Sequence, residues 1–416
     1  MDRFIAPGSL RGALTPPCSK SYAQRALAIA LLTQGRTTLR NLELCDDTRS
    51  AIRCIEALGA RVERVDDSTL IVEGGLSPQA ETLQMGESGL ATRLFTPIAA
   101  LSSNPITITG EGTLLRRPMA MMVEPLRSLG VQVLDGGGYL PIRVEGPIRG
   151  GEVEVDGSIS SQFITGLLIS LAAREQEATI RVENPVSLPY YDITIDATRH
   201  FGREILHNEN YTEFYIPEGA SYQPTDLFIE SDWSAAAAWL VAGALAGEVR
   251  VEHLSMLSKQ ADVALCHALE RAGAELICEE EAITALKSDL RGFEFDATHS
   301  PDLFPVLTAL AASAEGVSLI KGTSRLEYKE SHRAEVLREE YGKLGIEIDL
   351  STPDLMRIRG GKIRGGVCSS HGDHRIAMAL ALSALVSAEG IEIEDAEAVS
   401  KSYPSFFEDL ELLRVR

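Results

Sequence analysis

A signature that recurs about every seventy residues constrains the fold of this chain more than any other feature. Five apolar, helix-like stretches each end in a glycine that precedes a short alternating segment. These glycines lie 71 or 72 residues apart, at Gly59, Gly130, Gly202, Gly273 and Gly345. Glycine often follows a helix directly, because without a Cβ atom it adopts positive φ at little cost. The regular spacing therefore predicts a repeated unit in which one helix ends at each glycine.

A second series has a similar spacing and adds one more copy. Six short alternating segments follow Ala- and Leu-rich stretches, and they begin at Thr37, Ile106, Ala178, Glu248, Val317 and Ile391. Alternation predicts strands and the apolar stretches predict helices, so the chain contains six α/β units. The sixth unit reaches Arg416 before its last strand, and we expect residues 3–14 to supply it.

The six units divide into three and three. A chain of 416 residues exceeds what one hydrophobic core usually organises, and 44% hydrophobic residues are enough to build two. The alternative is a solenoid in which each unit touches only its neighbours. A unit of about 70 residues is longer than the usual solenoid periods. We therefore favour two similar domains over the solenoid.

The charge balance limits the kinds of partner. The chain has 39 Lys and Arg against 60 Asp and Glu, a formal net charge of -21. This excess of acid argues against a broad surface that binds nucleic acid or an anionic membrane. Any anion site must therefore be a local concentration of cations.

Targeting and redox features favour the cytoplasm. Residues 1–17 contain no apolar leader core, and the longest apolar run, residues 235–246, is too short to cross a bilayer. The six cysteines form no CxxC pair, which argues against a zinc knuckle or a dense disulfide framework. We expect a cytoplasmic protein with reduced thiols.

The first cationic segment is Ser19-Lys20-Ser21, followed by Arg25. It leads into an apolar stretch that predicts a helix from near Ala26. Hydroxyls, backbone amides and a lysine at the positive end of a helix suit a phosphate group. An ordinary capped helix is the alternative. The same Ser-Lys-Ser pattern recurs around Lys401.

Three further segments place donors ahead of predicted helices. Residues 86–93 bring small residues to the start of one helix, and residues 158–163 bring a run of serines and Gln162 to another. Arg116 and Arg117 precede a proline-started helix and suit bidentate binding of carboxylate or phosphate. The alternatives are simple N-caps and surface charge.

The C-terminal half adds a mixed cluster of charges. Lys329 and Arg333 are four residues apart, which predicts one helical face with Glu330 beside them, although a solvated salt-bridged face is equally consistent. His371 and His374 open an Ala-rich helix. A metal half-site there lacks a matching Cys or His motif, so we predict no metal.

Together and in this order, these segments resemble the 5-enolpyruvylshikimate-3-phosphate synthases (3-phosphoshikimate 1-carboxyvinyltransferases) of the enolpyruvyl transferase family, over almost the whole chain. The motifs that carry the resemblance are Ser19-Lys20-Ser21 with Arg25, Arg117-Pro118, Ser160-Ser161-Gln162-Phe163, Pro189-Tyr190-Tyr191-Asp192-Ile193-Thr194, His299-Ser300-Pro301-Asp302, Lys329-Glu330-Ser331-His332-Arg333, Asp373-His374-Arg375 and Lys401. The resemblance implies an α/β fold of the inside-out barrel type, with two similar domains of three βαβαββ-type repeats each. The implied domains are residues 1–18 with 230–416 and residues 19–229.

The resemblance implies an enzyme that transfers the enolpyruvyl (carboxyvinyl) group of phosphoenolpyruvate to the 5-hydroxyl of shikimate 3-phosphate and releases phosphate. This is a step of the shikimate pathway to chorismate and the aromatic amino acids. Asp302 is implied as the base, Glu330 as the proton donor to the methylene, and Lys20 as a catalytic cation close to both substrates. No metal or organic cofactor is required, and we expect a monomer.

The resemblance also implies the substrate-binding residues. Those for phosphoenolpyruvate are Lys20, Gly89, Arg117, Gln162, Arg333, Arg375 and Lys401. Those for shikimate 3-phosphate are Ser21, Arg25, Ser160, Ser161, Ser187, Asp302 and Lys329, with Tyr190 nearby.

Three positions depart from the family's usual pattern. Cys18 stands where Gly is common, Glu87 begins a run that is usually Asn-Ala-Gly-Thr, and His332 replaces an Asp or Asn. One rival is the sister enzyme that uses a UDP-amino sugar and carries a reactive cysteine on a loop, but no cysteine lies between Cys54 and Cys266. Another is a silent anion-binding homologue, which the presence of both Asp302 and Glu330 disfavours.

Overall fold

The structure is a computed structural model that describes residues 1–327 and 329–415 and forms two compact units. The central unit is Cys18–Glu230, and the terminal unit is Met1–Pro17 together with Ser231–Arg416. The chain therefore crosses between the units twice, once after Pro17 and once after Glu230.

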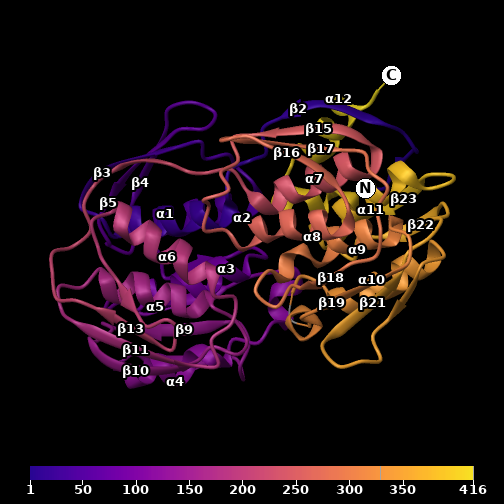
Figure 1. Cartoon of the computed structure of the whole chain (residues 1–416). Coiled ribbons are helices and arrows are strands. Elements are labelled where there is room, and N and C mark those ends of the chain that lie inside the picture. Colours follow the sequence, from indigo (N-terminus) through magenta and orange to yellow (C-terminus); the bar gives the residue numbers. More distant parts are fainter. Residues whose placement is uncertain (328, 416) are drawn as a thin grey trace. The chain divides into compact units, whose positions relative to one another are not determined.

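The central unit contains three four-stranded sheets (Figure 1). Their strand orders are β14-β3-β5-β4, β6-β7-β9-β8 and β10-β11-β13-β12. In chain order the strands are β3 (Gly35–Arg40), β4 (Arg61–Arg64), β5 (Leu70–Gly74), β6 (Thr82–Gln84), β7 (Ile106–Thr109), β8 (Gln132–Asp135), β9 (Ile142–Glu145), β10 (Gly151–Asp156), β11 (Ala178–Glu183), β12 (Leu206–His207), β13 (Glu213–Ile216) and β14 (Asp226–Phe228).

Three almost wholly buried helices, α1, α3 and α5, form the core of this unit. The helices of the unit are α1 (Lys20–Leu32), α2 (Asp46–Ala57), α3 (Gly89–Ala99), α4 (Val123–Ser128), α5 (Gln162–Ala172) and α6 (Pro189–His200). Helix α3 packs on α5 and on α1, and nearly every residue of these three helices is buried. The sheet strands alternate buried and exposed residues, as in β11, because one face packs on the helices and the other meets water.

The terminal unit repeats this plan. Its sheets are β16-β17-β15-β2, β18-β19-β21-β20 and the three-stranded β1-β23-β22. The strands are β1 (Arg3–Ile5), β2 (Leu10–Leu14), β15 (Gly247–Glu252), β16 (Glu275–Cys278), β17 (Ala282–Leu286), β18 (Glu294–Asp296), β19 (Val317–Lys321), β20 (Glu347–Asp349), β21 (Leu355–Arg359), β22 (Gly366–Ser369) and β23 (Ile391–Glu394). The helices are α7 (Trp233–Ala246), α8 (Leu265–Ala272), α9 (Phe304–Ser313), α10 (Arg333–Lys343), α11 (His374–Val386) and α12 (Phe406–Leu413), of which α7, α9 and α11 pack on one another.

The strand pairing confirms the six predicted units. Within the described residues there are six sheets, and each four-stranded sheet has one parallel pair and two antiparallel pairs, as in β10-β11-β13-β12. Residues 3–14 supply two strands rather than one. Strand β1 pairs antiparallel with β23 of the last unit, whereas β2 pairs parallel with β15.

The five spaced glycines end helices as predicted. All have positive φ, from 79° at Gly202 to 112° at Gly59. Each follows a helix directly or after one residue, and a short strand begins two residues later, except after Gly202, where β12 begins four residues later. At Gly59 a Cβ atom would also lie 2.4 Å from the carbonyl oxygen of Ser77, so a side chain there would clash with the backbone.

Three predicted helix starts are wrong. No helix begins at Pro118, because the short 3-10 helix η2 (Ala120–Met122) and then α4, from Val123, follow it. Helix α1 begins at Lys20 rather than near Ala26, because the Ser19 hydroxyl caps it by accepting from the Tyr22 amide. Helix α10 begins only at Arg333, so Lys329 and Glu330 precede it and share no helical face with Arg333. Tertiary ion pairs, described below, hold these two residues.

Apolar helices in the described residues stay within the two cores. None of them is long and apolar enough to cross a membrane. The longest, α7, has 14 residues and is buried almost throughout.

Candidate active site

In the central unit, Lys20 stands at the start of α1. Its ammonium lies 3.0 Å from a carboxylate oxygen of Asp47, at the start of α2, and both side chains are largely buried. The N-terminus of α1 adds partial positive charge beside Lys20. Asp47 therefore anchors the lysine. Sequence reasoning missed this partner because it lies on another helix, α2.

Arg25 lies inside α1 and is fully buried. It donates to the hydroxyls of Thr194 and Thr165 at 2.9 and 3.2 Å, and to the carbonyls of Ser21 and Tyr190 at 2.8 and 3.3 Å. Within the described part of the chain, all four acceptors are neutral oxygens. Burial lowers the pKa of Arg25 to about 10. The site thus contains a buried positive charge without a matching carboxylate.

A second cationic group surrounds the N-termini of α3 and α5. Arg93 donates to the side-chain oxygen of Gln162 at 2.7 Å. Arg117 is buried, and a Cβ atom on Gly89 would lie 2.8 Å from its guanidinium, so only glycine lets Arg117 lie so close to α3. Arg93 was overlooked as a site residue, although its segment was noted.

Three of the predicted serines, Ser160, Ser161 and Ser187, lie at turns that precede helices, whereas Ser21 lies in the first turn of α1. The Ser160 hydroxyl accepts from the backbone amide of Gln162 at 3.2 Å, and Ser161 is the N-cap residue of α5. Ser187 is buried with a φ of 55°, and its carbonyl accepts from the Tyr190 amide at 3.0 Å. Since the Tyr190 carbonyl accepts from Arg25, this turn is held to the buried arginine.

The Arg116–Arg117 pair divides between surface and interior. Arg116 is exposed at the end of the short turn η1 (Gly112–Arg116), and only Arg117 is buried. The unusual acid Glu87 accepts from the amide and hydroxyl of Thr113 at 3.2 and 2.8 Å. Its carboxylate therefore serves as an acceptor for η1.

In the terminal unit, Arg333 is the centre of a network of carboxylates. It is fully buried and donates to Asp302, Glu330 and Asp373, each at 2.7 Å. Burial opposes ionisation, but the three carboxylates outweigh it and raise the pKa of Arg333 well above its usual value. Lys329 and Arg333 thus meet at Asp302, and Glu330 joins them through Arg333, so ion pairs and not a helical face bring the three residues together.

Asp302 precedes α9 and accepts from three cations. Besides Arg333, Lys329 lies 3.2 Å and Arg375 3.4 Å from its oxygens. Burial raises the pKa of Asp302, but Arg375, Lys329 and Arg333 together hold it well below its usual value. Burial in turn lowers the pKa of Lys329. Asp302 is therefore ionised near neutral pH.

Helix α11 brings Arg375 into this network. Asp373 is its N-cap and accepts from the Arg375 amide at 3.0 Å and from the Ser331 hydroxyl at 3.0 Å. The predicted Lys401 is buried at the end of η6 (Ala396–Lys401), which packs on α11. The structure thus places Asp302, Lys329, Glu330, Arg333 and Arg375 in one cluster, with Lys401 on a neighbouring element.

Sequence reasoning also missed Asp262. It is buried, accepts from the Ser234 hydroxyl, and leaves its other oxygen without a hydrogen-bond partner in the described residues. Burial raises the pKa of Asp262 to about 6, against the opposing charge of Arg375. No motif indicated it, because a lone Asp before an ordinary helix carries no pattern.

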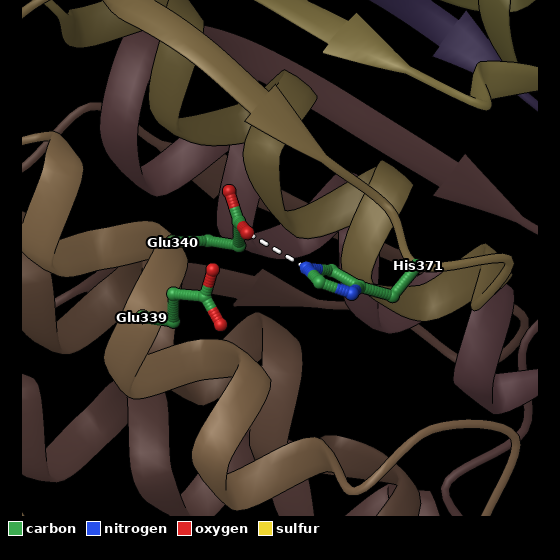
Figure 2. A group of neighbouring side chains, drawn as sticks. All are labelled: Glu339, Glu340 and His371. Atoms are coloured by element: carbon green, nitrogen blue, oxygen red, sulfur yellow. Dashed lines mark hydrogen bonds and ion pairs between the residues drawn. The ribbon is translucent and has the colours of Figure 1, made fainter.

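One group of side chains has the composition of a metal site. Glu339, Glu340 and His371 offer ligand atoms within 4.8 Å of one another (Figure 2). However, the ammonium of Lys343 lies 2.8 and 2.9 Å from the two oxygens of Glu340. A resident cation already neutralises that carboxylate, so the residues do not suit a divalent ion.

Comparisons with known proteins cover nearly the whole chain. The family model described as EPSP synthase (3-phosphoshikimate 1-carboxyvinyltransferase) matches residues 5–410. A 3-phosphoshikimate 1-carboxyvinyltransferase of Aeropyrum pernix is 37% identical over 418 residues, covering 100% of this chain and 96% of that protein. One of Thermococcus kodakarensis is 37% identical over 97% of this chain and 98% of its own length. A crystal structure of EPSP synthase from Acinetobacter baumannii, at 24% identity, has a TM-score of 0.84 and covers 99% of this chain and 98% of that one.

Proposed function

The chain belongs to the EPSP synthase (3-phosphoshikimate 1-carboxyvinyltransferase) family, and from this membership we propose how its residues carry out the family's reaction. The enzyme transfers the carboxyvinyl group of phosphoenolpyruvate to the 5-hydroxyl of shikimate 3-phosphate and releases phosphate, a step of the shikimate pathway. The observation that carries the proposed mechanism is the buried cluster in which Asp302 and Glu330 share the cation Arg333.

The reaction requires proton transfers in both directions. The acceptor hydroxyl loses a proton as it attacks C2 of phosphoenolpyruvate, and the methylene carbon gains one. The tetrahedral adduct then eliminates phosphate by the reverse movement. Asp302 takes the hydroxyl proton, because cations hold it ionised beforehand. Glu330 delivers the proton to the methylene, and Lys20 stabilises charge on both substrates.

Shikimate 3-phosphate binds to the hydroxyl-rich group around Arg25. The buried guanidinium supports this assignment, since its charge meets only neutral oxygens and a phosphate would neutralise it. The residues proposed for this substrate are Ser21, Arg25, Ser160, Ser161, Ser187, Tyr190, Asp302 and Lys329.

Phosphoenolpyruvate binds to the remaining cations. The buried Arg117 beside Gly89 supports this assignment, because its guanidinium can donate to a compact anion. The residues proposed for phosphoenolpyruvate are Lys20, Gly89, Arg117, Gln162, Arg333, Arg375 and Lys401.

The predicted domains, residues 1–18 with 230–416 and residues 19–229, correspond in this proposal to the terminal and central units. A monomer in the cytoplasm completes the proposal. The free thiols of Cys45, Cys54, Cys266, Cys278 and Cys368 support a reducing compartment. Light scattering on the purified protein measures the oligomeric state.

Phosphate release from phosphoenolpyruvate tests the function directly. We expect release with shikimate 3-phosphate as the acceptor and none with UDP-N-acetylglucosamine. Release with the sugar nucleotide alone would instead assign the sister activity. Release with neither acceptor would favour a silent anion-binding protein.

Variants test the assigned roles. Lys20→Met is expected to lower kcat by about 10³-fold, as does loss of one preorganised electrostatic contact in other enzymes. Asp302→Asn and Glu330→Gln should each lower kcat by roughly 10²- to 10⁴-fold, the range for general acids and bases. Lys259→Met is the matched control, because this lysine is exposed. Wild-type turnover of Lys20→Met, with the circular dichroism of the native fold, would refute the role of Lys20.

A further inference from the structure

Helix α10 touches the turn before α11 at two points. At its first residue, Arg333 donates to Asp373. Seven residues later, Glu340 lies on the same helical face and reaches the same turn. One Glu340 oxygen lies 2.7 Å from Nε2 of His371 (Figure 2). The other oxygen accepts from the backbone amide of Ser369 at 3.0 Å.

The turn that Glu340 holds has an unfavourable backbone. His371 has a φ of 53°, which is uncommon for a residue with a side chain, and Gly372 follows at 69°. The Ser370 hydroxyl accepts from the Gly372 amide at 3.1 Å and donates to the Asp395 carbonyl at 2.9 Å. A non-glycine residue keeps this conformation only when its surroundings hold it there.

The contact between Glu340 and His371 is not needed to neutralise a buried charge. Glu340 is fully buried, but Lys343 already contacts both of its oxygens. Burial opposes ionisation, yet hydrogen bonds from Lys343, His371 and the Ser369 amide lower the pKa of Glu340. The contacts of Glu340 with Ser369 and His371 therefore fix the position of the turn and do not serve to neutralise charge.

That turn places the groups of the proposed active site. Asp373, two residues after His371, accepts from both Arg333 and the Arg375 amide. A shift of the turn would therefore move the N-cap of α11 and both arginines with it. In catalysis, displacements of the order of 1 Å have large effects on rate.

We propose that Glu340 and His371 are positioning residues, which clamp residues 369–373 to α10 and thereby aim Arg375 and Arg333 at phosphoenolpyruvate. This inference rests on the proposed function, which gives both arginines to that substrate. Neither residue of the clamp touches the reacting atoms.

The informative variant is His371→Gly. It removes the ring and also relieves the positive φ, so the folded state loses a contact without gaining strain. We expect the KM for phosphoenolpyruvate to rise about tenfold, because the turn no longer positions the two arginines, and kcat to fall by a similar factor, because Arg333 also holds Asp302 and Glu330. The KM for shikimate 3-phosphate should change by less than about twofold. The melting temperature should stay at the wild-type value.

Two companion variants sharpen the measurement. His371→Gln is expected to restore most of the affinity for phosphoenolpyruvate, since its amide can donate to Glu340. Glu339→Gln is the matched control on the same helix, because Glu339 is exposed and contacts only Lys343, at 3.7 Å, among its ion-pair partners in the described residues. It should behave as the wild type.

Arg375→Ala separates the clamp from the proposed function. If Arg375→Ala raises the KM for phosphoenolpyruvate but His371→Gly does not, the clamp is refuted and the function stands. If neither variant changes that KM, the role of Arg375 and the clamp are both overturned. A fall in melting temperature with equal rises in both KM values would reduce His371 to a structural residue. Stabilisation of the wild type by Zn²⁺ that His371→Gly abolishes would overturn the clamp in favour of a metal site.

Discussion

Two fully buried arginines, Arg25 in the central unit and Arg333 in the terminal unit, have opposite electrostatic environments. Arg25 donates only to hydroxyl and carbonyl oxygens in the described residues, and burial lowers its pKa to about 10. Arg333 is equally buried, yet three carboxylates raise its pKa well above the usual value. Burial alone therefore does not decide the state of a buried cation, whereas its partners do.

This difference assigns different work to the two units. The group around Arg25 carries charge that is not neutralised internally and so favours an anionic ligand. The group around Arg333 is internally paired and holds Asp302 and Glu330, which are the base and the acid of the proposed mechanism. The reaction needs both, since the substrates are polyanions and the chemistry is proton transfer.

The largest expected effect is on stability at the two arginines. Arg333→Met leaves the buried Asp373 and the half-buried Asp302 and Glu330 without their shared cation and should lower the free energy of unfolding by about 3–5 kcal/mol. Arg25→Met should change it by less than about 1 kcal/mol, because Thr165 and Thr194 still hydrogen-bond to each other at 3.0 Å. Urea denaturation measures both. Equal losses in the two variants would remove the distinction.

A second comparison lies within the terminal unit, between Asp262 and Asp302. The pKa of Asp262 is raised by burial to about 6, so the folded state binds a proton that the unfolded state releases between about pH 4 and 6. The wild type should lose up to about 3 kcal/mol as pH rises through this window. Asp262→Asn should therefore be more stable than the wild type above pH 6 and equal to it near pH 4.

The control for Asp262 is Asp302→Asn, measured by urea denaturation over the same pH range. The pKa of Asp302 is depressed, so its ionised form contributes stability above its unfolded pKa that is lost as pH falls. Asp302→Asn should consequently be less stable than the wild type at neutral pH. The same sign for both variants would contradict the assigned environments.

Binding of shikimate 3-phosphate should depend on the charge of Arg25, which donates only to neutral oxygens in the described residues. At 100 times its dissociation constant, shikimate 3-phosphate is expected to stabilise the wild type by about 2.7 kcal/mol. Arg25→Met should lose this stabilisation, since it removes the buried cation meant for the phosphate. Thermal unfolding with and without ligand measures the effect, and undiminished stabilisation of the variant would place the phosphate elsewhere.

The smallest expected effect concerns Glu87. Its carboxylate accepts two hydrogen bonds from Thr113, so Glu87→Ala should lower stability by about 1 kcal/mol. Glu87→Gln keeps an acceptor oxygen and should lose less. Chemical denaturation distinguishes the two variants, and a large fall in kcat for Glu87→Gln would show that the acid acts on substrate instead.

Much of the fold could be predicted because its signals are local and periodic. The glycines that end helices, such as Gly130 and Gly273, have the positive φ that their spacing implied. The start of α10 was mispredicted because Lys329 and Glu330 form ion pairs instead of a first helical turn. Lys329 pairs with Asp302 before α9, and Glu330 pairs with Arg333 at the start of α10. Asp47 and Asp262 were missed for a similar reason, since their partners Lys20 and Ser234 are close only after folding.

The sequence by itself determined the six-unit α/β plan, because helix-ending glycines and alternating strands depend on local backbone preferences. Its ordered motifs indicated the family before any contact was known. Only the tertiary structure decided which cations are neutralised, with Arg25 facing neutral oxygens and Arg333 facing carboxylates. Charge and pKa depend on the distance to groups far away in sequence and on the exclusion of water, and both arise only when the chain folds.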